Sequence, residues 1–183
     1  PEAWTLDELV AAAKALTTPD SFGLQVQGGS GEAAIASTFG ASPLSADGKT
    51  ATYDTPEMLA HKTFLRDLIY KYKVSPKPDE LSTQQDPFTS GQVNMVFAGS
   101  WMIPSYRDDA SFDWDILPNP SGELDAKNYG GPDNIGVYAK GKNLAAAKAF
   151  AKFAAFNPAA QGVVSSTGSW PVLTDLFLDK GLV

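Results

Sequence analysis

The segment Phe88–Trp101, with the sequence FTSGQVNMVFAGSW, contains the pattern that decides the fold. From Gln92 to Ala98 the side chains alternate towards an apolar strand, and the strand is then broken by Gly99 and Ser100. Alternation with a period of two is typical of a strand that lies against a core. The segment therefore predicts a strand that ends in a Gly-Ser turn bearing a tryptophan.

Helices and further short strands are predicted around this strand. Thr5 and Glu8 have the spacing of a capping box for a helix that ends at Leu16. Asp54 is expected to cap a second helix, with Pro56 in its first turn. The other expected elements are strands at 22–26, 50–53, 112–117 and 134–139, and helices at 32–38, 143–156, from 158 onwards and after 171. Helices that alternate with strands predict an α/β layer architecture.

Composition excludes several classes of protein. The 183 residues are 43% hydrophobic and 19% charged, which is typical of a globular chain. The longest apolar stretch, 144–156, is interrupted by Lys148 and Lys152 and is shorter than the ~20 residues of a membrane span. A net charge of −7, with scattered Lys and Arg residues, argues against a nucleic-acid partner. Without cysteine there is no disulfide, thiolate or Cys-ligated metal.

The titratable side chains give little basis for catalysis. His61 is the only histidine, and it shares a helical face with Met58, Leu65 and Leu68, so we expect it to lie in the core. One histidine without cysteine supports neither a Ser/His/Asp triad nor a His-rich zinc site. No glycine-rich segment is followed by the Lys-Ser/Thr of a phosphate loop. We therefore predict no catalytic residue, no metal site and no cofactor.

Paired carboxylates leave one enzymatic alternative open. A glycoside hydrolase uses two carboxyl groups that face each other across one cleft. The candidates are Asp108 with Asp109, Asp113 with Asp115, and Asp133. Neighbours in a chain rarely face each other, so a solvated surface is the favoured interpretation of these aspartates.

The tryptophans give a stronger indication of function. Trp101 and Trp170 stand beside Gly and Ser in predicted loops, where an indole face can stack on a pyranose ring or plug the edge of a lobe. Trp4 precedes a helix cap and Trp114 lies within a predicted strand, so we expect these two to be structural.

Several segments match a known pattern in the same order along the chain. They are Pro1–Glu8, Lys14–Thr17, Phe22–Gly23, Asp47–Glu57, Phe64–Pro76, Phe88–Met95, Gly99–Trp101, Phe112–Pro118, Gly130–Gly131, Asn143–Phe156 and Gly168–Pro171. Together they resemble the family 1 extracellular solute-binding proteins, the maltose-binding-protein-like group. Each segment alone is weak evidence, but the ordered set covers the whole chain.

This resemblance implies a fold and a set of ligand-binding residues. The fold would be the two-lobed, type II-like periplasmic-binding-protein fold, whose lobes close on a sugar. Trp101 matches the tryptophan that stacks on sugar. Three groups would complete the site: Gln27, Ser30 and Glu32 on a loop of the same lobe, Gly130, Gly131 and Asp133 where the chain returns through the cleft, and Trp170 on the last cleft loop.

The resemblance also implies that the chain is part of a longer protein. Residues 1–120 would form most of the second lobe, and residues 121–183 the hinge crossing and the return segment of the first lobe. The expected partners are a carbohydrate, the permease subunits of an ABC transporter, and the first-lobe segment that would precede Pro1. The protein would act outside the cytoplasm, in a periplasm or anchored by lipid at the cell surface. A carbohydrate-active hydrolase or carbohydrate-binding module is the alternative function.

Overall fold

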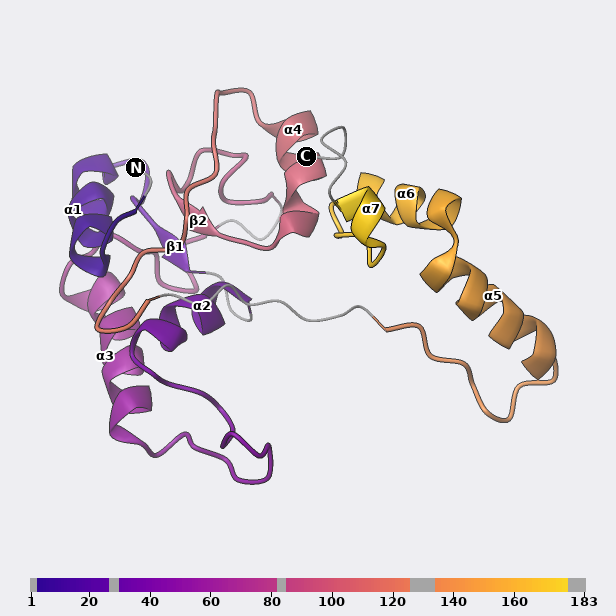
Figure 1. Cartoon of the computed structure of the whole chain (residues 1–183). Helices are drawn as coiled ribbons and strands as arrows, with labels where there is room; N and C mark the ends of the chain where they lie inside the picture. Colours follow the sequence, from indigo (N-terminus) through magenta and orange to yellow (C-terminus); the bar gives the residue numbers. More distant parts are fainter. Residues whose placement is uncertain (1–2, 27–29, 82–84, 126–133, 178–183) are drawn as a thin grey trace. The chain divides into compact units, whose positions relative to one another are not determined.

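The computed structural model describes residues 3–26, 30–81, 85–125 and 134–177. The chain forms two compact units, each described separately below. The first unit comprises Pro1–Ala98 and Asp109–Gly130, and the second comprises Gly99–Asp108 and Gly131–Val183. Figure 1 shows the order of the elements along the chain. None of the helices formed by the described residues is long and apolar enough to cross a membrane.

Helix α1 (Leu6–Leu16) begins at the predicted capping box. The Thr5 hydroxyl accepts a hydrogen bond from the Glu8 backbone N–H at 3.2 Å, and the Glu8 carboxylate accepts one from the Thr5 N–H at 2.7 Å. Its inner face buries Leu9 and Ala13 in the core of the first unit. The core also contains Leu24, Ile35, Leu68 and Val74, which come from the later segments of this unit.

A parallel sheet of two short strands lies in the first unit. Strand β1 (Gln25–Val26) pairs with β2 (Val96–Phe97), so that Gln25 lies opposite Val96. A bridge between Phe22 and Val93 extends the pairing towards the start of both strands. The predicted strands at 22–26 and 92–98 are therefore present, although their regular parts are shorter than expected.

Two further helices complete the first unit, where α2 (Ser30–Thr38) packs against both β2 and α3 (Pro56–Tyr70). Pro56 is the first residue of α3, as predicted, but the cap is Thr55, not Asp54. The Thr55 hydroxyl accepts a hydrogen bond from the Met58 N–H at 3.3 Å. His61 is 1% exposed, which confirms that it is a core residue.

The second unit is helical in its described part. A 3₁₀ turn, η1 (Ser100–Met102), leads into α4 (Ile103–Asp109). Helices α5 (Leu144–Phe156), α6 (Pro158–Ser166) and α7 (Thr174–Phe177) then follow one another, each packed on the next (Figure 1). The Asn157 side chain caps α6 by accepting from two backbone N–H groups at 3.0 and 3.3 Å. Helix α5 contains no buried residue.

Several predicted strands are absent from the described residues. Segments 112–117 and 134–139 have no strand structure, and segment 50–53 contributes only the bridge of Ala51 with Leu44. A strand exists through hydrogen bonds to a neighbouring strand, which alternation in one segment cannot supply. Helix α4 was not predicted, although Pro104 in its first turn is a recognised helix-start signal.

The compact units differ from the predicted division into 1–120 and 121–183. Gly99–Asp108, which includes Trp101, belongs to the second unit, while residues 121–130 belong to the first. The assignment of the two ranges to two lobes stays a prediction.

Candidate functional site

The carboxyl edge of the β1–β2 sheet is the first candidate for a ligand site. The strands are parallel, so their carboxyl ends lie at the same edge. Ligands of open α/β sheets bind outside this edge. Strand β1 leads from this edge through residues 27–29, which lie outside the described residues, into α2 and the predicted binding residue Glu32.

A glycine fixes the start of α2 against β2. A Cβ atom on Gly31 would lie 2.7 Å from the Phe97 Cβ and 2.9 Å from the Phe97 carbonyl oxygen. Contacts this short do not occur, so only glycine lets the helix come so close to the strand. The backbone of Glu32, the next residue, is thereby held beside the end of β2.

The Glu32 side chain makes an ion pair across two helices. Its Oε1 atom contacts the Nζ atom of Lys62 on α3, and the two side chains are 30% and 48% exposed. Next to Lys62, burial lowers the pKa of His61, and the Lys62 charge lowers it further while Glu32 raises it. Lys62 was not predicted as a site residue, because sequence patterns do not show that residues 30 positions apart meet.

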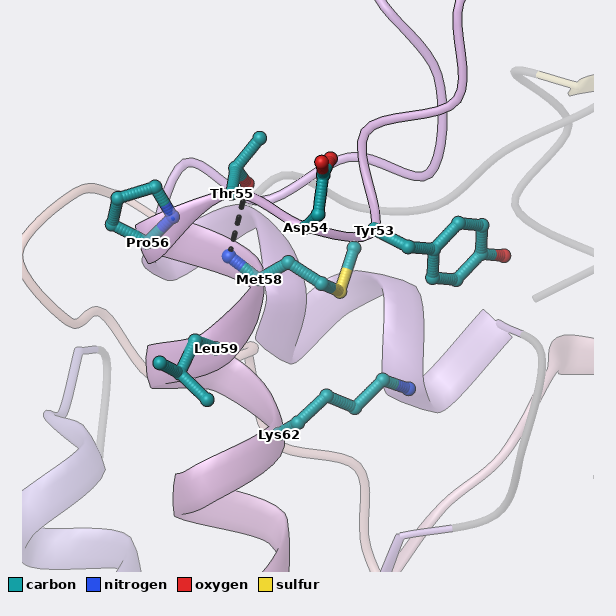
Figure 2. Close-up of a pocket in the computed structure, with 7 residues that line it drawn as sticks. All are labelled: Tyr53, Asp54, Thr55, Pro56, Met58, Leu59 and Lys62. Atoms are coloured by element: carbon teal, nitrogen blue, oxygen red, sulfur yellow. Dashed lines mark hydrogen bonds between the residues drawn. The ribbon is translucent and has the colours of Figure 1, made fainter.

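Lys62 also lines a shallow pocket of about 400 Å³ beside the start of α3. Figure 2 shows that Tyr53 and Lys62 extend on the same side of α3, with the Met58 side chain between them. Met58 is 4% exposed, whereas Tyr53 and Leu59 are 65% and 70% exposed. The pocket therefore has a buried apolar base and an aromatic rim.

The sequence predicts a loop at Trp101, but in the structure this residue lies in η1 of the second unit. It is nevertheless 58% exposed, so the ring is available to solvent. The indole ring covers Gly99, where a Cβ atom would collide with the ring carbons. The Gly-Ser pair thus has a steric role, since glycine leaves room for the tryptophan to fold back over the turn.

The loop that bears Trp170 contacts the turn that bears Trp101. Gly168 has φ +82°, and a Cβ atom there would lie 2.5 Å from the Ser100 carbonyl oxygen and 2.8 Å from the Trp101 Cα. Trp170 is 52% exposed, and its ring centroid lies 5.4 Å from that of Phe177. Two largely exposed tryptophans therefore come from segments that touch each other.

A buried glutamine holds this loop in place. Gln161 on α6 is 5% exposed. Its Nε2 donates to the Ala154 carbonyl oxygen of α5 at 2.8 Å, and its Oε1 accepts from the Val172 N–H at 2.9 Å. The loop after Trp170 is thus tied to both long helices of the second unit, which restricts where the indole can lie.

Gln27, Gly130, Gly131 and Asp133 lie outside the described residues. Ser30 is the first residue of α2, and the structure does not describe its side chain.

Trp4 makes a structural contact, and two of the aspartates considered for a hydrolase lie at the surface. Trp4 is structural, since its indole N–H donates to the Pro118 carbonyl oxygen at 2.6 Å. Asp113 and Asp115 are exposed. Among the described residues, no three His, Cys, Asp or Glu side chains gather as metal ligands would.

The matching family is described as bacterial extracellular solute-binding protein, and its model covers residues 1–182. The chain belongs to this family. No curated protein sequence matches it significantly. The family assignment agrees with the resemblance found in the sequence and assigns the chain to extracellular binding proteins.

Solved structures that are similar to this chain have the two-lobed fold of sugar-binding proteins. One is an ABC substrate-binding protein from Listeria monocytogenes in complex with cycloalternan, with a TM-score of 0.81 and 26% identity over 97% of this chain and 47% of that one. Another is a maltose/maltodextrin-binding domain from Bdellovibrio bacteriovorus bound to maltotriose, with a TM-score of 0.75 and 19% identity over 100% and 51% of the two chains. A third, from Thermotoga lettingae, is an ABC transporter solute-binding protein bound with α-D-tagatose, with a TM-score of 0.68 and 23% identity over 93% and 47%.

The chain spans about half the length of these solved structures.

Proposed function

We propose that the protein containing this chain binds a neutral mono- or oligosaccharide and delivers it to the permease of an ABC transporter, without chemical turnover. The observation that supports this most directly is the contact between the Trp101 turn and the Trp170 loop, which brings together two segments that bear exposed indoles. Aromatic faces bind the apolar faces of sugar rings, and polar groups around them accept hydroxyl hydrogen bonds.

The family and the ligands of similar structures support the same class of ligand. Solute-binding proteins bind without transforming their ligand, and the three similar structures hold cycloalternan, maltotriose and tagatose. All three are uncharged carbohydrates. The Glu32 carboxylate suits such a ligand, because a carboxylate accepts several hydrogen bonds from hydroxyl groups.

The proposal extends to partners and location. Residues 1–120 would supply most of one lobe and residues 121–183 the return segment of the other, whose remainder would be a further segment of the same protein. Two observations support this: the similar structures are twice as long, and α5 leaves Phe150, Phe153 and Phe156 exposed. The family is extracellular, and we place the protein in a periplasm or on a lipid anchor at the cell surface.

A fluorescence titration of the natural full-length protein tests the proposal. Cycloalternan, maltotriose, maltose and tagatose form the panel, and a charged sugar phosphate serves as the control. We expect at least one neutral sugar to change the tryptophan emission saturably and to be recovered intact after long incubation. Binding of the sugar phosphate alone, or cleavage of the sugar, would overturn the proposal.

A further inference from the structure

We propose that Lys62 is a positioning residue for ligand binding, which holds the Glu32 carboxylate at the carboxyl edge of the sheet so that it accepts hydrogen bonds from the sugar hydroxyls. This inference rests on the proposed function, because it requires the ligand to be a sugar. It adds a residue that neither the sequence pattern nor the family resemblance indicated.

The backbone of Glu32 is already fixed without Lys62. Gly31 brings the first turn of α2 against Phe97, and α2 packs on both β2 and α3. What the backbone does not fix is the direction of the long Glu32 side chain, which has three rotatable bonds. A free side chain of this kind loses rotamer entropy when a ligand immobilises it.

The ion pair supplies that missing constraint. Lys62 Nζ contacts Oε1, and an ionised carboxylate has acceptor sites for about four hydrogen bonds. The carboxylate can therefore keep the Lys62 contact and still accept from a sugar. Lys62 itself comes from a helix whose position is set by the buried side chains of Met58, His61 and Leu68.

The exposure of the Lys62–Glu32 ion pair distinguishes a role in ligand binding from a role in folding stability. The Lys62 and Glu32 side chains are 48% and 30% exposed, and ion pairs at such exposed positions contribute little to folding. Loss of the pair should therefore affect the affinity for sugar and leave the unfolding temperature nearly unchanged. The Lys77–Glu80 pair, at 3.0 Å and with 48% and 37% exposure, is a matched control elsewhere in the same unit.

The test is a double-mutant cycle on sugar affinity in the natural full-length protein, with the sugar of the panel that binds most tightly. We expect Lys62→Met to weaken binding roughly three- to tenfold, the range for freeing one long side chain, and Lys62→Arg to restore most of it. Lys77→Met should bind as the unmodified protein does. In a Glu32→Gln background, Lys62→Met should cause almost no further loss, because its effect passes through the carboxylate.

Four outcomes would overturn the proposal. Unchanged affinity in Lys62→Met excludes a positioning role, and so do additive effects of the two substitutions. A loss of affinity that follows a lowered unfolding temperature and is not rescued by Lys62→Arg would make Lys62 merely structural. If the unmodified protein binds no sugar at all, the proposed function fails and this inference fails with it, a result distinct from sugar binding without coupling.

Discussion

At the scale of single residues, Trp101 is the side chain whose replacement should affect binding most. We predict that Trp101→Ala costs roughly 1–3 kcal/mol of sugar-binding free energy, from lost apolar burial and aromatic stacking. Because Trp101 is 58% exposed, the free energy of unfolding should fall less than the ~3–5 kcal/mol of a buried Trp→Ala change. Calorimetric titration and denaturant unfolding of the same variant measure both quantities.

Trp4 provides the control for this prediction. Its indole donates to Pro118, so Trp4→Phe should lower the free energy of unfolding and leave sugar affinity unchanged. A Trp101→Ala protein that binds normally but unfolds easily would show that Trp101 is structural instead.

His61 should make the stability of the protein depend on pH. Burial, and then the Lys62 charge, lower its pKa in the folded state below the ordinary value of about 6.5. The unfolded chain therefore takes up the proton first, and stability falls as pH falls from about 6.5 towards the folded pKa. The decrease is at most about 1.4 kcal/mol per pH unit.

Denaturant unfolding at pH 7.5 and pH 5.5 measures this effect. Both pH values lie above the ordinary pKa of a carboxyl group, which is about 4. A His61→Leu variant has no proton to take up, so it should show a smaller difference between the two pH values. An equal loss of stability in both proteins would contradict the assignment.

The role of a single residue could be predicted from the sequence where that role depends on residues nearby in the chain. The Thr5 capping box follows from two residues three positions apart, and the burial of His61 from its helical face. The pairing of Glu32 with Lys62 could not be predicted, because it depends on how two helices pack. Trp101 was expected in a loop and lies in a 3₁₀ turn, which the local sequence did not indicate.

At the scale of elements, two glycines should respond to alanine in opposite ways. A Cβ atom on Gly23 would collide with the backbone of Ala13 in α1, so Gly23→Ala should destabilise by about 1–3 kcal/mol. Gly162 lies within α6 with open space around it, so Gly162→Ala should stabilise by about 0.5–1 kcal/mol. Thermal unfolding of both variants compares them, and a stable Gly23→Ala protein would contradict the close packing of α1 on the Phe22–Val26 segment.

Helices were predicted better than strands at this scale. Helices α1, α3 and α6 begin at side-chain caps that their own sequence supplies, so their positions follow from local signals. The segments at 112–117 and 134–139 have the composition of strands, yet no strand forms there. Strand formation depends on a partner that a single segment does not specify.

At the scale of the whole molecule, the exposed face of α5 should determine whether the isolated chain self-associates. Phe150, Phe153 and Phe156 are 67%, 50% and 65% exposed and recur every three residues on one side of the helix. Apolar patches of this kind favour association. We predict that the polypeptide 1–183 self-associates, and that the natural full-length protein does not.

Sedimentation velocity of two charge variants tests whether α5 is responsible. Phe150→Lys should reduce self-association, because it places a charge within the apolar face. Val163→Lys adds the same charge at an equally exposed position on α6, and it should have little effect. A monomeric polypeptide 1–183 would contradict the proposal that a further segment covers α5.

Isothermal titration calorimetry of the natural full-length protein with maltotriose, cycloalternan and tagatose tests the central claim most directly. Sugar held between two closing lobes should give saturable binding, with one sugar per protein. Chromatography of the solution from the calorimeter cell should then recover the sugar uncleaved. Trp101→Ala, titrated in parallel, should bind the same sugar about 5- to 150-fold more weakly, as 1–3 kcal/mol requires. The absence of binding heat with all three sugars, or the recovery of cleaved sugar, would contradict the account.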